Sequence, residues 1–166
     1  MAAEPAGADG VPLDGRRIAV VVSARDPASA RLADAASSWL GARGARVSRH
    51  PVPAAFEVAQ FAAWLADAGE VEGIVACASI VRGETMHDRH LARSVTDALL
   101  AAATRTGVPI GNAVLTVETG EQAAARSGGA RGNRGEDAAR AVAGLLAARD
   151  RLAARRPVDL GPEPGS

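Results

Sequence analysis

The sequence predicts an α/β fold, a three-layer α/β/α sandwich in which a four-stranded parallel sheet is covered by helices on both faces. Short runs rich in β-branched residues alternate along the chain with longer helical patterns, the order that is typical of βαβ units. The chain shows neither a repeat of fixed period nor a second core. Its 166 residues, 48% of them hydrophobic and with a formal net charge of zero, suit a single core-forming domain.

The first two strand–helix pairs occupy residues 17–68. Arg17–Ser23 is a continuous apolar run, as expected of a central parallel strand. Pro27–Arg43 carries apolar residues at helical spacing after an initial proline, and Gly44 ends this predicted helix. Arg46–Val52 is the second predicted strand, and a helix over about 56–68 follows it.

The second half of the chain continues the alternation with two more strands, each followed by a helix, and then a glycine-rich link and a final helix to about Arg155. Residues 1–15 and 156–166 lack periodicity and are rich in small residues and proline, so we expect flexible ends around a domain at 16–155. The predicted bounds in the second half are Val71–Val81, about 86–105, Pro109–Val117, about 120–126 and, for the link, Ser127–Gly135.

Composition excludes several classes of protein. Balanced charge argues against a nucleic-acid protein that works through a general basic surface. The sequence has no run of 18 or more apolar residues that could span a bilayer, and no signal-peptide pattern opens it. We therefore expect a cytoplasmic protein without membrane or nucleic-acid partners.

Cys77, the one cysteine, lies in an apolar run, where a thiol is more often a buried core residue than a nucleophile. All 19 basic residues are arginine, a bias that a GC-rich coding sequence explains more simply than function.

The turn after the third predicted strand is a candidate anion site, because ligands of open α/β sheets bind at the carboxyl ends of the strands. Gly83, Glu84 and Thr85 stand directly before a helix whose free backbone N–H groups could bind a phosphate. His87 would stand in the first turn of that helix, beside the anion, where an imidazole suits proton transfer. The alternative is that Thr85 only caps the helix and that His87 is a solvated helix residue.

Two further loops carry candidate ligand-binding residues. Ala55, Phe56 and Glu57 follow the second strand and combine backbone groups, a ring and a carboxylate, which suits a polar, planar ligand. The alternative is that Phe56 belongs to the core. Arg126 and Arg134 flank the glycine-rich link, where guanidinium groups could clamp a phosphate or simply be solvated.

Taken in order, these segments resemble lumazine synthase, the riboflavin-pathway enzyme family that makes 6,7-dimethyl-8-ribityllumazine. The resemblance runs over about residues 17–152. Each segment is a weak signal alone, but together they occur in the right order and at the right spacing. The segments are Val52–Glu57, Ile80–His87, Pro109–Glu118, and Glu121–Ala123 with Gly132–Gly135.

The resemblance implies a flavodoxin-like arrangement and a condensation of 5-amino-6-(D-ribitylamino)uracil with 3,4-dihydroxy-2-butanone 4-phosphate, without a metal or an organic cofactor. His87 matches the family's proton-shuttling histidine. Residues matching the phosphate site are Glu84, Thr85, Arg126 and Arg134, the last where the family usually has lysine. Residues matching the binding site of the uracil substrate are Arg25, Ala55, Phe56, Glu57, Ser79, Ile80, Val81 and Asn112.

The sequence departs from the family pattern chiefly in the region expected to bind the pyrimidine. Arg25 stands where the family has an aromatic ring that stacks on the pyrimidine, and its planar guanidinium could stack instead. Ala54 and Ala78 replace glycines, and Asp88 follows the histidine where the family usually has an aromatic residue. The residues expected to serve proton transfer and phosphate binding are retained.

These observations support two functions over a third. The first is an active lumazine synthase, and the second is a related assembly or altered-ligand-binding protein with weak or no synthase activity, which Arg25 suggests. A flavodoxin-like nucleotide-binding module is disfavoured because the glycine-rich turn after the first strand is absent. The resemblance also implies small-molecule substrates and homopentamers with active sites between neighbours. The short link at Gly128–Asn133 is similar to that of members whose pentamers close into icosahedral shells.

Overall fold

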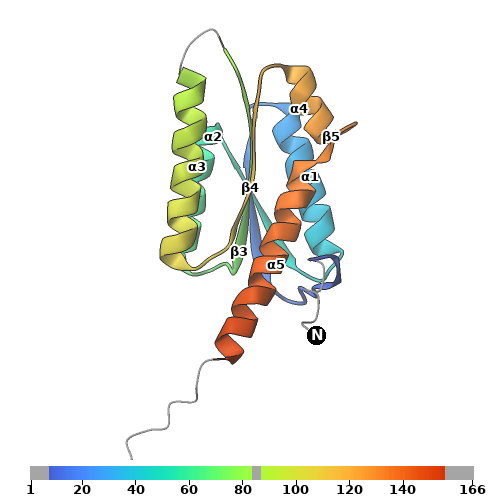
Figure 1. Cartoon of the computed structure of the whole chain (residues 1–166), viewed down its shortest axis with the longest axis vertical. Helices are drawn as coiled ribbons and strands as arrows, with labels where there is room; N and C mark the ends of the chain where they lie inside the picture. The colour runs from blue at the N-terminus through green and yellow to red at the C-terminus, as the bar shows by residue number, and fades with distance from the viewer. Residues whose placement is uncertain (1–7, 84–86, 156–166) are drawn as a thin grey trace, which may run out of the picture.

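The computed structural model describes residues 8–83 and 87–155, and it confirms the predicted parallel sheet with helices on both faces (Figure 1). Four strands lie in the order β2-β1-β3-β4. β1 (Arg17–Ser23) pairs in parallel with β2 (Arg46–Val52) on one side and β3 (Gly73–Val81) on the other. β4 (Ile110–Val117) pairs in parallel with β3 and forms the second edge. This is a flavodoxin-like arrangement.

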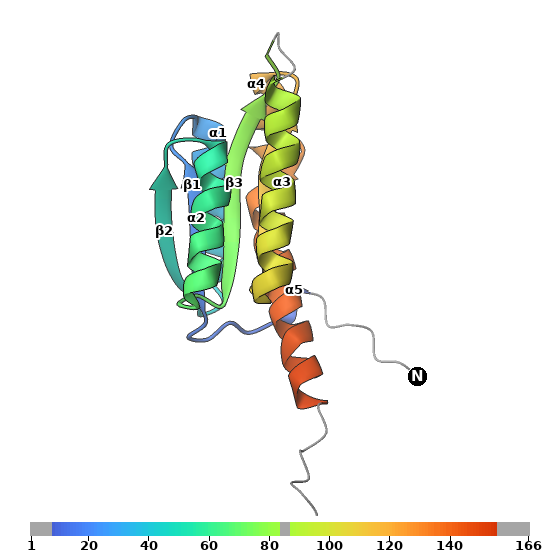
Figure 2. The ribbon, with the colours of Figure 1, turned by 90° about the vertical axis from the view of Figure 1, so that its left-hand side faces the viewer.

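The helices divide between the two faces of the sheet. α2 (Ala55–Ala68) and α3 (His87–Thr106) pack against each other on one face, which Figure 2 shows in front. α1 (Pro27–Gly41), the short α4 (Gly120–Arg126) and α5 (Arg134–Ala154) cover the other. Each predicted strand and helix is present within two residues of its expected bounds. None of the helices in the described ranges is long and apolar enough to cross a membrane.

The glycine-rich link contains structure that the sequence did not predict. β5 (Ser127–Gly129) and β6 (Gly132–Asn133) form a small antiparallel hairpin. Gly128 and Gly132 have φ angles of 112° and 75°, which side chains rarely tolerate, so glycine allows the chain to reverse here. The buried hydroxyl of Ser127 accepts a hydrogen bond from the Arg31 side chain of α1 at 3.1 Å, which holds the hairpin against the domain.

The segment before β1 also contributes to the fold, although residues 1–15 were expected to be flexible. A 3₁₀ turn, η1 (Ala8–Gly10), opens the described part of the chain. Leu13 is only 1% exposed and its backbone N–H donates to the carbonyl oxygen of Arg43 at 2.9 Å. Leu13 therefore packs with the core of the domain.

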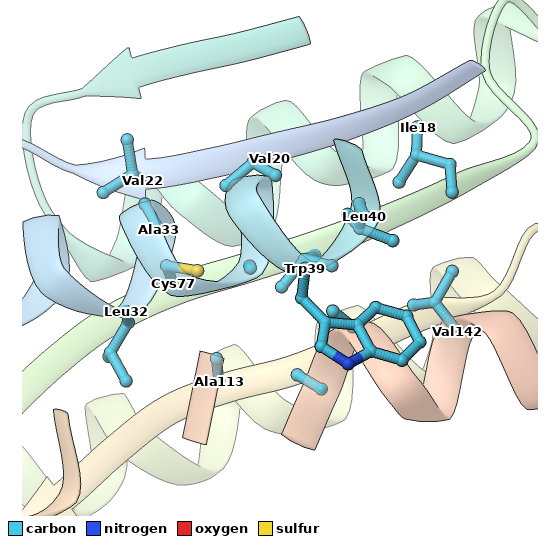
Figure 3. Close-up of a cluster of buried hydrophobic side chains, with 14 of the residues drawn as sticks. Ile18, Val20, Val22, Leu32, Ala33, Trp39, Leu40, Cys77, Ala113 and Val142 are labelled. Carbon is cyan, nitrogen blue, oxygen red and sulfur yellow. The ribbon is translucent and has the colours of Figure 1, made fainter. Parts of the chain in front are cut away.

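Close packing on the α1–α5 face suits the alanine-rich composition. A Cβ on Gly135 would lie 1.9 Å from the carbonyl oxygen of Leu32, and one on Gly111 would lie 2.4 Å from that of Ala138. Only glycine allows α5 to come this close to α1 and β4. Figure 3 shows the cluster between these elements, with side chains from Ile18, Val20, Val22, Leu32, Trp39, Leu40, Cys77 and Val142.

Candidate functional site

A cleft of about 420 Å³ opens at the carboxyl ends of β1, β2 and β3. These strand ends lie at the top of Figure 1. This is the edge at which parallel α/β sheets bind ligands. Six of the residues singled out from the sequence line it: Arg25, Ala55, Ser79, Ile80, Val81 and His87. The other lining residues are Ser23, Asp26, Ala54, Asp88 and Leu91.

The backbone around Arg25 is held from both sides. The Ser23 hydroxyl accepts a hydrogen bond from the Arg25 backbone N–H at 3.3 Å. Asp26 caps α1, because its carboxylate accepts from the Ser29 backbone N–H at 2.9 Å and from the Ser29 hydroxyl at 2.7 Å. The turn after β1 is thus fixed, and it presents the Arg25 side chain to the cleft.

The end of β3 forms the inner wall of the cleft. Ile80 is buried and Val81 is exposed. The hydroxyl oxygen of Ser79 is buried, and it has no hydrogen-bond partner within residues 8–83 and 87–155. A buried hydroxyl without a partner is costly, so a ligand group in the cleft would find a hydrogen-bonding position available at Ser79.

The first turn of α3 forms the opposite wall. His87 has an exposed side chain there, and Asp88 beside it is half-buried. Glu84 and Thr85, the residues predicted to bind phosphate through the preceding turn, lie outside the described residues. The cleft therefore presents an imidazole next to the end of β3, the position expected for proton transfer to a bound ligand.

Only one of the three residues predicted to bind a ligand at the start of α2 lines the cleft. Buried Ala55 lines the cleft, whereas Phe56 and Glu57 are not among its lining residues. Phe56 is 51% exposed, so the alternative that it belongs to the core is wrong. Its ring points outward because it lies on the outer side of the first turn of α2, next to the buried positions Ala55 and Val58.

A second hollow lies on α4 and the hairpin after it. Its volume is about 440 Å³, and its two cationic residues are Arg126 and Arg131. Among the described residues, the Arg126 guanidinium donates a single hydrogen bond, a long one of 3.4 Å to the carbonyl oxygen of Gln122. Arg131 was not singled out from the sequence, because the link contains two arginines, Arg131 and Arg134, and only its folding into a hairpin shows which one lies beside Arg126. The remaining lining residues are Thr119, Glu121, Gln122 and Ala125.

Arg134 and Asn112, like Phe56 and Glu57, line neither hollow. Arg134 begins α5, where its guanidinium pairs with Asp137 at 3.1 Å. Asn112 lies on the edge strand β4 with an exposed side chain, and its Oδ1 accepts from the Val114 backbone N–H at 3.0 Å. Both stay exposed on the surface of one chain, where a neighbouring molecule could reach them.

Cys77 is not suited to act as a nucleophile. Burial raises the pKa of the Cys77 thiol to about 12, so the thiolate that would act as a nucleophile is strongly disfavoured. Within residues 8–83 and 87–155, no three His, Cys, Asp or Glu side chains are grouped so that they could hold a metal ion. The chemistry of the cleft centres on an imidazole, a guanidinium and a hydroxyl.

Comparison with known proteins extends over most of the chain. A family model described as 6,7-dimethyl-8-ribityllumazine synthase matches residues 15–149. A protein of that name from Methylobacterium radiotolerans is 39% identical over 147 residues, which cover 87% of this chain and 89% of the relative.

Two other relatives match over a shorter region. Proteins of the same name from Rhodopirellula baltica and Xanthomonas campestris pv. campestris are 41% and 40% identical over 95 residues, which are 57% of this chain. The match spans only 61% and 62% of those two relatives. The family match nevertheless covers well over half of this chain, and it includes both hollows. The chain belongs to the 6,7-dimethyl-8-ribityllumazine synthase family.

Proposed function

We propose that this protein is an active 6,7-dimethyl-8-ribityllumazine synthase. It would condense 5-amino-6-(D-ribitylamino)uracil with 3,4-dihydroxy-2-butanone 4-phosphate, with loss of phosphate and water and without a cofactor. The observation that carries the proposal is the cleft at the carboxyl end of the sheet, in which Arg25, Ser79 and His87 come together from three separate segments. Membership of the family supplies the identity of the substrates.

Positioning supplies much of the catalysis in this proposal. An amine and a ketone already react with each other, and holding them side by side replaces a bimolecular encounter by a reaction within one complex. His87 would move protons during Schiff-base formation and phosphate elimination, because its exposed imidazole faces the cleft. No metal or nucleophilic side chain enters this scheme.

The uracil substrate would occupy the part of the cleft between β1 and β3. A polar edge of the pyrimidine would give the Ser79 hydroxyl a hydrogen-bond partner, which it lacks within the described residues. The Arg25 guanidinium would lie against the ring face, since the turn that carries it is fixed by Ser23 and Asp26. Phe56 and Glu57 would bind the ribityl chain from the rim.

The phosphate would be bound by Arg126 with Arg131 and Arg134, together with the turn at Glu84 and Thr85. In one chain the Arg126 hollow shares no lining residue with the His87 cleft. The hollow lies on α4, which packs on the face of the sheet opposite α3 (Figure 1). This separation supports a site shared between neighbouring subunits, in which one supplies His87 and the next supplies Asn112 and Arg126.

The assembly in this proposal is a pentamer that closes further into a shell. The short link between α4 and α5, folded into the β5–β6 hairpin, is similar in length to that of shell-forming members. Size-exclusion chromatography with light scattering is expected to give a mass of at least five chains at micromolar concentration. A monomer or dimer under those conditions would contradict the assembly.

Synthase activity has a direct test. Purified protein incubated with both substrates should show the growth of lumazine absorbance and fluorescence together with the release of inorganic phosphate. Omission of either substrate is the control. No lumazine above the background of the uncatalysed reaction, with folded protein confirmed by circular dichroism, would count decisively against the proposal.

Sharing of the site between subunits is tested by mixing two inactive variants, His87→Ala and Arg126→Ala. After the variants are unfolded together and refolded, roughly a quarter of the interfaces should join an intact His87 to an intact Arg126, so a comparable share of wild-type activity returns. Each variant refolded alone is the control. No recovery in assemblies shown to contain both chains would place both residues in one subunit's site.

A second candidate function is binding of an altered ligand with weak or no synthase activity. The observation that favours it is Arg25, which brings a charge into the cleft where the family has a stacking ring. Isothermal titration with the uracil substrate alone separates the two functions. A large gain in affinity for Arg25→Phe supports the altered ligand, whereas unchanged affinity supports an arginine that already stacks on the pyrimidine.

A further inference from the structure

A carboxylate joins Gly83, just after the end of β3, to the first turn of α3. Asp88, the second residue of α3, accepts a hydrogen bond at Oδ2 from the backbone N–H of Gly83, with a donor–acceptor distance of 2.5 Å. Gly83 lies two residues beyond the end of β3. The contact therefore connects the end of a sheet strand to the first turn of a helix, directly beside the histidine that faces the cleft.

Gly83 and Asp88 fit each other sterically as well. A Cβ built on Gly83 would lie 2.8 Å from Oδ2 of Asp88, closer than such atoms are found in proteins. A side chain at position 83 would displace the carboxylate end of Asp88 by a few tenths of an ångström and so disturb the hydrogen bond. The contact can thus be removed at Asp88 and disturbed more mildly at Gly83.

The charges around Asp88 leave its carboxylate free for this backbone contact. Asp88 lines the cleft with His87, and it also lines a small hollow with Arg82, Arg89 and Glu118. Arg82 is engaged by Glu118, whose two carboxylate oxygens accept from its Nη1 at 2.9 and 2.8 Å. Asp88 is therefore not needed to balance Arg82, and its position in the first turn of α3 is favourable toward the helix dipole.

We propose that Asp88 is a positioning residue for the reaction proposed above. Its hydrogen bond to Gly83 holds the first turn of α3 against the end of β3, and so it holds the His87 imidazole in place in the cleft. The first turn of a helix frays easily, and displacement of a reacting group by about 1 Å can lower a rate about a hundredfold. The kinetic part of the inference rests on the proposed function, whereas the structural part can be measured without catalysis.

The test compares Asp88→Asn, Asp88→Ala and Gly83→Ala with Asp97→Ala as the matched control. Asp97 lies on the exposed side of the same helix, where it pairs with Arg93. Asp88→Asn retains an oxygen acceptor and should keep most of kcat. Asp88→Ala should lower kcat about tenfold, and Gly83→Ala by a smaller factor, while KM for both substrates changes less than about twofold in each variant.

Hydrogen–deuterium exchange measures the contact independently of activity. Peptides that cover residues 82–90 should exchange faster in Asp88→Ala and Gly83→Ala, and at the wild-type rate in Asp88→Asn and Asp97→Ala. Unchanged exchange in Asp88→Ala overturns the inference whatever the activity. Faster exchange with wild-type kcat also overturns it, and so does an Asp88→Asn enzyme as impaired as Asp88→Ala. If wild-type protein and control are both inactive, the proposed function fails, and the exchange data still decide whether Asp88 holds the turn.

Discussion

Arg16 and Arg105 at one end of the sheet differ in their partners from Arg25, His87 and Arg131 at the other end. At the amino-terminal end, Arg16 binds the carboxylates of Glu72 and Asp150, and Arg105 pairs with Asp67. At the carboxyl end, Arg25, His87 and Arg131 line hollows and join none of the ion pairs found within residues 8–83 and 87–155. The first group serves the fold, and the second group is available to a ligand. Substitutions at the two ends should therefore have separable effects on stability and on activity.

The largest effect on activity is expected from His87→Ala. Removal of a general acid–base group lowers kcat by about a hundredfold or more. The midpoint of thermal unfolding should stay within about 2 °C of the wild type, because the side chain is exposed. Steady-state kinetics and a thermal melt provide the two measurements. His90→Ala, an exposed position on the same helix outside the cleft, is the control, and equal losses in both variants would remove His87 from its proposed role.

The largest effect on stability is expected from Gly135→Ala, in the packed layer that supports both ends of the sheet. The new methyl group would collide with the Leu32 backbone, at a cost of about 3 kcal/mol in the free energy of unfolding. Gly144→Ala is the matched control on the same helix, because its Cβ would meet no atom within 4 Å. It should stabilise the protein by up to about 1 kcal/mol. Urea unfolding measures the free energy of unfolding of both variants. Equal values for the two variants would contradict the prediction.

An intermediate effect is expected at the Arg126 hollow. Arg131→Ala removes a cation that shares the hollow with Arg126, so KM for the phosphate-bearing substrate should rise about tenfold. Arg134→Ala should raise this KM less, because the Arg134 guanidinium is partly neutralised by Asp137. Initial rates at varied phosphate substrate measure both variants. A larger rise for Arg134→Ala would show that the Asp137 pair breaks when the substrate binds.

The smallest effect concerns Glu72 at the amino-terminal end. The backbone N–H of Arg17 and the side chain of Arg16 hold the pKa of the Glu72 carboxyl below its usual value of 4.5. A carboxyl group whose folded pKa is depressed contributes stability above its unfolded pKa, and this contribution is lost as pH falls through the folded pKa. Glu72→Gln should lower the free energy of unfolding by about 0.5 kcal/mol at pH 7, and the difference should shrink below about pH 4. Unfolding curves at several pH values test this, and kcat should not change.

The regular elements could be predicted from sequence because each carries a long local signal. Arg17–Ser23 is apolar throughout, and Pro27–Gly41 begins with a proline and repeats its apolar residues at helical spacing. The β5–β6 hairpin was missed because a strand of two or three residues built from glycine and serine has no hydrophobic pattern. Leu13 was missed because a single apolar residue in a segment rich in glycine and proline resembles a flexible end.

Side-chain contacts of the site were harder to predict than its location. The rule for parallel sheets indicated the turn that carries His87, and the family resemblance added Arg25 and Ser79. All three line the same cleft. Which of the two arginines in the link lies beside Arg126 depends on the conformation of the link, so Arg131 was not singled out. The hydrogen bond of Asp88 to Gly83 depends on the distance between two element ends, which a linear sequence does not contain.

The separation of the His87 cleft from the Arg126 hollow has a consequence for how activity depends on concentration. If each chain carries two different half-sites, an isolated subunit contains every residue needed for the reaction and completes none of its sites. Specific activity should then fall on dilution below the concentration at which subunits dissociate, and it should return when the subunits are concentrated again. Catalysis would in that case be a property of the contact between chains. The strength of that contact would set the range of protein concentrations over which the enzyme is active.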